Sequence, residues 1–191
     1  NDLAFGKHAV SMFVPFLCVG TVLAALVVFD TFSRLHAFLL MLLYLVLSLG
    51  FADIFFTPIW HYYFDDPGRY SGYAHFMLAQ RTLWGGDAIA GMGQNAAYYV
   101  DQPGFRYFLA GMIQVLGGEH RLMQLSSMFL YLASVLFFLL STKRVLQRRM
   151  FFLVAAFFTC ALPYAANNIL EGLSEWLAVS LVLCFCSCVL R

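Results

Sequence analysis

Charged side chains are scarce in this sequence: Asp, Glu, Lys and Arg make up 11% of its 191 residues, whereas hydrophobic residues make up 62%. So few polar side chains cannot cover the surface of a water-soluble globule. The formal net charge is only +1, and this balance excludes the dense basic patch that binding to nucleic acid requires. Several apolar runs are long enough to cross a bilayer, so the sequence predicts an all-α integral membrane protein.

Cysteines in polar loops are also absent. All five cysteines lie in apolar runs: Cys18, Cys160, Cys184, Cys186 and Cys188. Residues two apart on a helix point to different faces, so the last three do not have the spacing of metal ligands. We interpret the cysteines as small apolar packing residues.

Five apolar segments are predicted to span the membrane as helices. They cover residues 8–29, 36–56, 122–141, 150–165 and 173–190. The fourth span is predicted to end at Pro163-Tyr164. Asp53 lies near the end of the second span, and a carboxylate inside a span is costly in hydrocarbon. We expect Asp53 either to face protein or water or to lie at the membrane interface.

The segment between the second and third spans, residues 57–121, is rich in Tyr and Trp, which favour the headgroup level of a membrane. Two short interfacial helices are predicted there. The second helix begins at Pro103 and continues to Leu116, where Gly117-Gly118 ends it. The apolar face of the first helix comprises Tyr70, Tyr73, Ala74, Met77 and Leu78.

Orientation follows from the distribution of cations. The turn at Arg34 and the loop 143–149 fall on the same side by parity, and together they hold five Lys or Arg against one acid, Asp30. The positive-inside rule therefore places these two connections in the cytoplasm and residues 57–121 outside. Between a bacterial cytoplasmic membrane and the endoplasmic reticulum, we favour the former.

Three short motifs occur in a fixed order along this chain. Asp66-Pro67-Gly68-Arg69-Tyr70 follows the second span, Pro103-Gly104 opens a helix that closes on Leu116-Gly117-Gly118, and Ser174-Glu175 begins the last span. Their order resembles that of membrane glycosyltransferases of the GT-C type, in particular the mannosyltransferases and aminoarabinose transferases that use dolichyl- or polyprenyl-phosphate sugars. That group has an Asp-Glu-x-Arg-Tyr pattern, in which Pro67 replaces the second acid here.

The resemblance covers residues 36–190 of a single transmembrane domain, 1–191, and corresponds to the N-terminal part of such an enzyme. We therefore expect the chain to belong to a longer protein, with further helices or subunits completing the site. The resemblance implies transfer of a sugar from a polyprenyl-phosphate donor to an acceptor at the outer face. It implies no organic cofactor, and the partners that it implies are the lipid-linked sugar and membrane lipids.

The candidate site residues are four acids, two arginines and one tyrosine: the resemblance implies the roles of Asp66, Arg69 and Glu175, and the others are candidates by their place in the sequence. Asp66 is the expected catalytic group, with Asp65 as the competing choice. Cations that would bind the donor phosphate are Arg69 and Arg106. The residues expected to line the cavity are Asp53, Tyr70 and Glu175.

Simpler interpretations stand beside each of these roles. Asp66 before a proline also suits a helix cap, which contributes about 1 kcal/mol. Interfacial arginines commonly meet lipid headgroups. A divalent metal held by His61, His75 and Asp65 is a further alternative. At the level of the whole chain, the alternative is a non-catalytic membrane subunit or scaffold that docks a partner through the aromatic segment 57–121.

Overall fold

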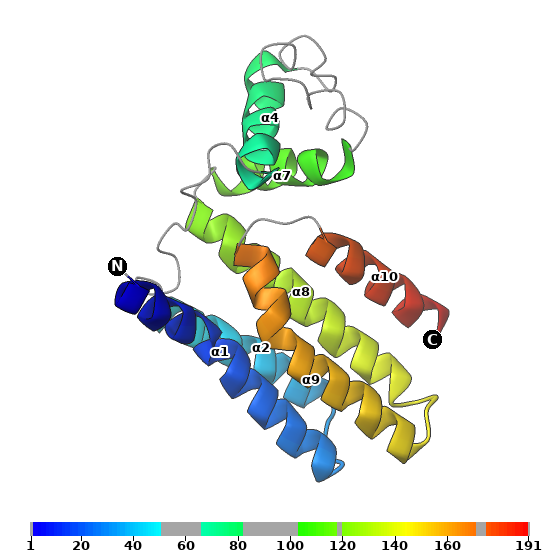
Figure 1. Cartoon of the computed structure of the whole chain (residues 1–191). Helices are drawn as coiled ribbons and strands as arrows, with labels where there is room; N and C mark the ends of the chain where they lie inside the picture. The colour runs from blue at the N-terminus through cyan, green and yellow to red at the C-terminus, as the bar shows by residue number, and fades with distance from the viewer. Residues whose placement is uncertain (1, 51–65, 82–102, 118–119, 171–174, 191) are drawn as a thin grey trace.

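The computed structural model describes residues 2–50, 66–81, 103–117, 120–170 and 175–190. Within these ranges the chain forms seven α-helices and no strand, so the predicted all-α class is confirmed for them (Figure 1). The helices are α1 (Asp2–Val28), α2 (Arg34–Gly50), α4 (Asp66–Gln80), α7 (Pro103–Leu116), α8 (His120–Thr142), α9 (Arg148–Leu170) and α10 (Glu175–Val189).

Every predicted helix has a counterpart, but two boundaries differ by several residues: α1 begins at Asp2 rather than at residue 8, and α9 ends later than predicted. The fourth span was predicted to end at Pro163-Tyr164, whereas α9 continues to Leu170. Proline removes one backbone hydrogen bond from a helix, and neighbouring helices in a bundle make that loss tolerable. Pro15 likewise lies inside α1 without ending it.

The predicted number of five membrane spans is not supported by the described residues. In those parts of the chain, one stretch is long and apolar enough to cross a membrane by length and composition: Leu125–Thr142 of α8, with a mean hydropathy of 1.9 over 18 residues. Four apolar helical stretches are shorter: Val14–Val28, Arg34–Ser48, Tyr107–Leu116 and Trp176–Val189.

Helix α8 is the centre of the bundle. It packs against α2, α9 and α10, and α1 covers α9 and α2. Leucines of α8 supply much of the core, because they recur at the three- and four-residue intervals that place side chains on one helix face. The largest fully buried side chains include Phe16, Leu23, Tyr44, Leu132, Leu136, Leu139 and Leu162.

The bundle buries small hydroxyl side chains and exposes large apolar ones. Five buried Ser and Thr hydroxyls each donate a hydrogen bond to a backbone carbonyl one turn earlier, at 2.6–3.1 Å. These residues are Ser134, Ser141, Thr142, Ser180 and Ser187. Large apolar side chains that are more than half exposed include Phe38, Leu153, Phe157, Leu181 and Phe185. The core is mostly apolar, and the outer surface carries many large apolar side chains as well.

The cysteines divide between these two environments. Cys184 and Cys186 are half-buried, and the Cys184 thiol lies 3.5 Å from Ser134 Oγ across the contact of α10 with α8. Cys18, Cys160 and Cys188 are exposed, so the predicted packing role fits only the first two.

Two turns meet at one end of the bundle. The Lys143 ammonium, after α8, lies 3.2 Å from the Asp30 carboxylate, after α1, and donates to the Phe32 carbonyl at 2.8 Å. Asp30 adopts a left-handed backbone conformation with φ 56°. As the sequence predicted, the α1–α2 and α8–α9 connections therefore lie at the same end.

Helices α4 and α7 form a pair at the other end of the bundle (Figure 1). Ala74 and Met77 of the predicted apolar face of α4 are buried, as are Leu109 and Ile113 of α7. Gly117 closes α7 with φ 80°, and its N–H donates to the Ile113 carbonyl at 2.8 Å. Both predicted helices exist; their location in a membrane interface stays a prediction.

Candidate functional site

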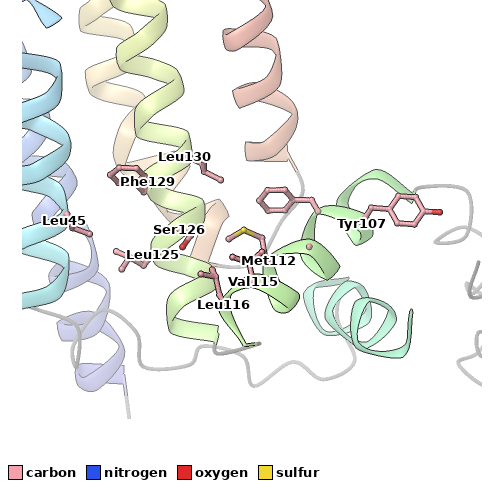
Figure 2. Close-up of a pocket in the computed structure, with 11 residues that line it drawn as sticks. Leu45, Tyr107, Met112, Val115, Leu116, Leu125, Ser126, Phe129 and Leu130 are labelled. Atoms are coloured by element: carbon pink, nitrogen blue, oxygen red, sulfur yellow. The ribbon is translucent and has the colours of Figure 1, made fainter. Parts of the chain in front are cut away.

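An apolar groove of about 730 Å³ lies where α7 meets α8, with α2 at its edge (Figure 2). In the close-up, Met112, Val115 and Leu116 extend from α7 toward Leu125 and Ser126 of α8. The described residues that line it are Leu45, Tyr107, Phe108, Gly111, Met112, Val115, Leu116, Leu125, Ser126, Phe129 and Leu130.

Among the residues that the structure describes, the lining of this groove contains no charged side chain. Its polar side chains are the phenol of Tyr107 and the hydroxyl of Ser126. The volume falls in the range of about 300–1,000 Å³ that is typical of small-molecule sites. A surface of this chemistry suits a hydrocarbon chain much better than a sugar or a phosphate.

The open space in the groove depends on one glycine of α7. Phe108, Gly111, Met112 and Val115 follow the i, i+3, i+4, i+7 spacing of a single helix face. Gly111 is exposed, and a Cβ added there would meet no atom within 4 Å. The absence of a side chain at this position therefore leaves the middle of the α7 wall unfilled.

Three aromatic rings fix α7 against the beginning of α10. The ring of Trp176 meets Phe108 edge-to-face at 5.5 Å and Phe105 at 6.4 Å. The two phenylalanine rings stack at 6.2 Å. Such pairs add about 0.5–1.5 kcal/mol each beyond area burial. The cluster thereby places the first turn of α10, which begins at Glu175, beside the helix that lines the groove.

The structure brings together the helices that carry several predicted site residues. Asp66, Arg69 and Tyr70 belong to the first turns of α4, which packs on α7. Arg106 belongs to α7, and Glu175 begins α10. The side chains of these five residues lie outside the described part of the structure, as do all of Asp53, Asp65 and His61. Their predicted contacts with a substrate stay predictions.

The beginning of α4 differs by one residue from the interpretation of Asp66 as a cap. The helix includes Asp66 as its first residue, whereas a cap would precede the helix. A carboxylate in the first turn still interacts favourably with the helix dipole. A difference of one residue in a helix boundary does not distinguish a cap from a first-turn residue, so both interpretations of Asp66 stay predictions.

Metal binding receives no support from the described residues, among which no three His, Cys, Asp or Glu side chains cluster. His75 is exposed on α4. The other two members of the possible metal set, His61 and Asp65, lie outside the described ranges. That alternative stays a prediction.

The groove residues of α7 and α8 were absent from the predicted site. The motif Pro103-Gly104 to Leu116-Gly117 marked only the two ends of α7. The signal that could have identified the groove was the single-face spacing of Phe108, Gly111, Met112 and Val115. That spacing does not reveal which helix lies opposite, so the cavity itself required the tertiary structure.

Neither protein-family models, nor curated proteins, nor solved structures match this chain. The resemblance to the GT-C enzymes therefore rests on its motifs alone.

Proposed function

We propose that this chain is a membrane-embedded glycosyltransferase component that moves a sugar from a polyprenyl-phosphate donor to an acceptor at the outer face. The observation that carries the proposal is the uncharged groove between α7 and α8, lined by the same helix that packs against α4. The isoprenoid tail of the donor occupies this groove. Its phosphate lies toward the beginning of α4, where the sequence carries Asp66 and Arg69.

Membrane embedding is supported by the large apolar side chains on the outside of the bundle. Phe157 and Phe185 expose 67% and 69% of their surface, whereas Ser187 is completely buried. Water makes such exposure of large apolar side chains unfavourable, whereas lipid tails do not. Small hydroxyl residues between helices allow close packing in a membrane, and their polar atoms are satisfied by backbone carbonyls.

Helix lengths also support several crossings. The 27 residues of α1 and the 23 residues of α8 and of α9 correspond to helices about 40 and 34 Å long, because each residue adds about 1.5 Å. The hydrocarbon core of a bilayer is about 30 Å thick. We propose that these three helices cross the membrane and that α2 and α10, whose described helices of 17 and 15 residues are about 26 and 23 Å long, form two further, shorter spans.

The proposed reaction assigns one role to each polar group. The Asp66 carboxylate accepts the proton of the acceptor hydroxyl as its oxygen forms a bond to the anomeric carbon of the donor sugar. The bond from that carbon to the phosphate oxygen breaks, and the polyprenyl phosphate leaves. Arg69 and Arg106 stabilise the negative charge of the leaving phosphate through paired N–H donors.

The catalytic assignment is tested by Asp66→Asn in the full-length protein. Loss of a general base lowers rates by about 10²–10⁴-fold, so we expect transfer from a radiolabelled polyprenyl-phosphate sugar to fall by at least about 100-fold. Gln80→Ala, at the exposed end of the same helix, is the matched control and retains activity. Unchanged transfer by a folded Asp66→Asn protein would exclude Asp66 as the base, and Asp65→Asn then tests its competitor.

The groove assignment is tested by filling it. Gly111→Leu places a side chain in the groove at a position where an added Cβ meets no atom within 4 Å. We expect the KM for a long-chain donor to rise about tenfold. The new side chain would displace part of the donor tail, and a loss of about 1.4 kcal/mol of apolar binding energy corresponds to a tenfold change in affinity. Gly104→Leu is the matched control, because Gly104 is equally open on α7 but does not line the groove. If neither variant changes donor binding, the groove is not the tail site; if the wild type binds no donor, the scaffold alternative gains support.

A further inference from the structure

A second cleft, of about 470 Å³, lies at the opposite end of the bundle from the α7–α8 groove. It forms where the end of α1 meets the beginning of α9 (Figure 1). Its lining combines two arginines with an apolar wall. The lining residues are Val27, Val28, Asp30, Arg148, Arg149, Phe151, Phe152 and Leu153.

The cleft has an excess of positive charge. Arg148 and Arg149 are both exposed, and no ion pair joins either of them to another part of the chain that the structure describes. Asp30 is the one acid in the lining. Its carboxylate is paired with Lys143 at 3.2 Å, so its charge is offset by a cation outside the lining.

The wall below the arginines is apolar and open. Val28, Phe152 and Leu153 expose 52%, 44% and 60% of their surface. Two cations at a helix end, with hydrocarbon side chains directly next to them, match a molecule that has an anionic head and an apolar tail. An inorganic anion would use only the arginines, and a neutral alkyl chain would use only the wall.

The backbone at the beginning of α9 also favours the binding of an anion. The Phe151 N–H donates to the Gln147 carbonyl at 2.9 Å and closes the first turn. The N–H groups at the beginning of a helix, together with the helix dipole, favour a negative group. They add to the charge of the two arginines, which begin this helix at Arg148.

We infer that this cleft binds an anionic phospholipid. Its phosphodiester contacts the guanidinium groups of Arg148 and Arg149, and an acyl chain lies along Val28, Phe152 and Leu153. Basic pockets between helices at one membrane face commonly hold anionic headgroups. The inference rests on the proposed membrane embedding but not on the proposed transferase activity.

The test is native mass spectrometry of the full chain purified in detergent and titrated with dioleoyl phosphatidylglycerol or dioleoyl phosphatidylcholine. We expect the wild type to retain phosphatidylglycerol preferentially. The double variant Arg148→Gln/Arg149→Gln should bind phosphatidylglycerol about thirtyfold more weakly, because each cation near a lipid surface contributes about a factor of five. Arg144→Gln is the matched control: this arginine is exposed in the same turn region but lies outside the cleft, and its loss should leave binding unchanged.

Equal affinity of the wild type and the double variant for phosphatidylglycerol would overturn the inference. So would displacement of the lipid by glycerol phosphate at an equal concentration, because the site would then recognise the anion without the acyl chain. Alkaline carbonate extraction of cell membranes separates this failure from that of the embedding proposal. A protein that stays in the membrane but shows no lipid preference refutes only the lipid site, whereas a protein released by carbonate refutes the embedding.

Discussion

At the scale of single residues, Lys143 joins more of the chain than any local motif suggests. Its ammonium group contacts the carboxylate and backbone carbonyl of Asp30 and the carbonyl of Phe32. The lysine side chain is 29% exposed and the Asp30 side chain 50%. Solvent weakens the ion pair at this exposure, so the more protected hydrogen bond to Phe32 carries much of the contribution.

Replacing Lys143 with Met retains the alkyl part of the side chain and removes these polar contacts. We expect a loss of about 1–2 kcal/mol in the free energy of unfolding, since hydrogen bonds from charged donors contribute somewhat more than neutral ones. Thermal unfolding in detergent measures the effect. Arg144→Met removes an exposed cation next to it and should change the stability by less than about 0.5 kcal/mol. Equal losses of stability in the two variants would mean that the loss of a positive charge in this turn, rather than the loss of the Lys143 contacts, lowers the stability.

At Tyr44, in contrast to Lys143, the polar group contributes little to the stability of the fold. The ring packs on Phe16 at 5.1 Å, whereas the buried hydroxyl has no hydrogen-bond partner among the described residues. Ser48, one turn later on α2, lies near this hydroxyl but does not meet hydrogen-bond geometry.

We therefore expect Tyr44→Phe to leave stability unchanged or to raise it by up to about 1 kcal/mol, because a buried unpaired hydroxyl is costly. Tyr44→Ala, which also removes the ring, should lower stability by about 3–5 kcal/mol. Urea unfolding monitored by tryptophan fluorescence compares the two. A large loss in Tyr44→Phe would show that the hydroxyl has a bonding partner.

At the scale of helices, the closest approach in the described part of the bundle that depends on a glycine is between α1 and α9. A Cβ on Gly20 would lie 3.3 Å from Thr159 Cγ2 and 3.7 Å from the Thr159 carbonyl oxygen. Small residues at such crossings allow two backbones to approach and gain dispersion contacts. Gly20 thus sets the distance between these helices.

Gly20→Leu should force α1 away from α9 and lower stability by about 1–3 kcal/mol, the usual cost of overpacking. Ala25→Leu is the matched control on the same helix, because Ala25 is exposed and the larger side chain has room. Melting temperatures of the two purified variants provide the measurement. Equal melting temperatures would argue against a close α1–α9 contact.

At the scale of the whole molecule, the sequence predicted the helices and the common end of the two basic turns, but not which helices pack against one another. Pro103 and Gly117 mark the two ends of α7 in the sequence, because the effects of proline and glycine on the backbone are local. The same local rule gave the wrong end for α9, where packing against α1 and α8 offsets the cost of Pro163. Tertiary contacts, which a linear pattern does not contain, decide such cases.

The candidate site divides in the same way. The charged residues of the motifs, such as Asp66 and Arg69, are visible in the sequence because charge is rare there. The groove consists of ordinary apolar residues and one missing side chain, at Gly111. Nothing in their types separates them from core residues, so only the packing of α7 on α8 identifies them.

The overall orientation is tested with two reporter positions at opposite ends of the bundle. In a protein whose five native cysteines are replaced by Ala, Val145→Cys lies in the basic turn and Gln80→Cys ends α4. A membrane-impermeant maleimide should label only the second in intact cells and both after lysis, because the positive-inside rule places the basic turn in the cytoplasm. Labelling of the first in intact cells would reverse the assigned orientation.

The contact between Lys143 and Asp30 also limits when the bundle can complete its packing during synthesis of the chain. The two residues are 113 positions apart, and ribosomes add about 5–20 residues per second. Asp30 is therefore added to the chain about 6–23 s before Lys143. During this interval the α1–α2 hairpin lacks both the Lys143 contact and the surface of α9 against which α1 packs, so later synthesis must complete its packing.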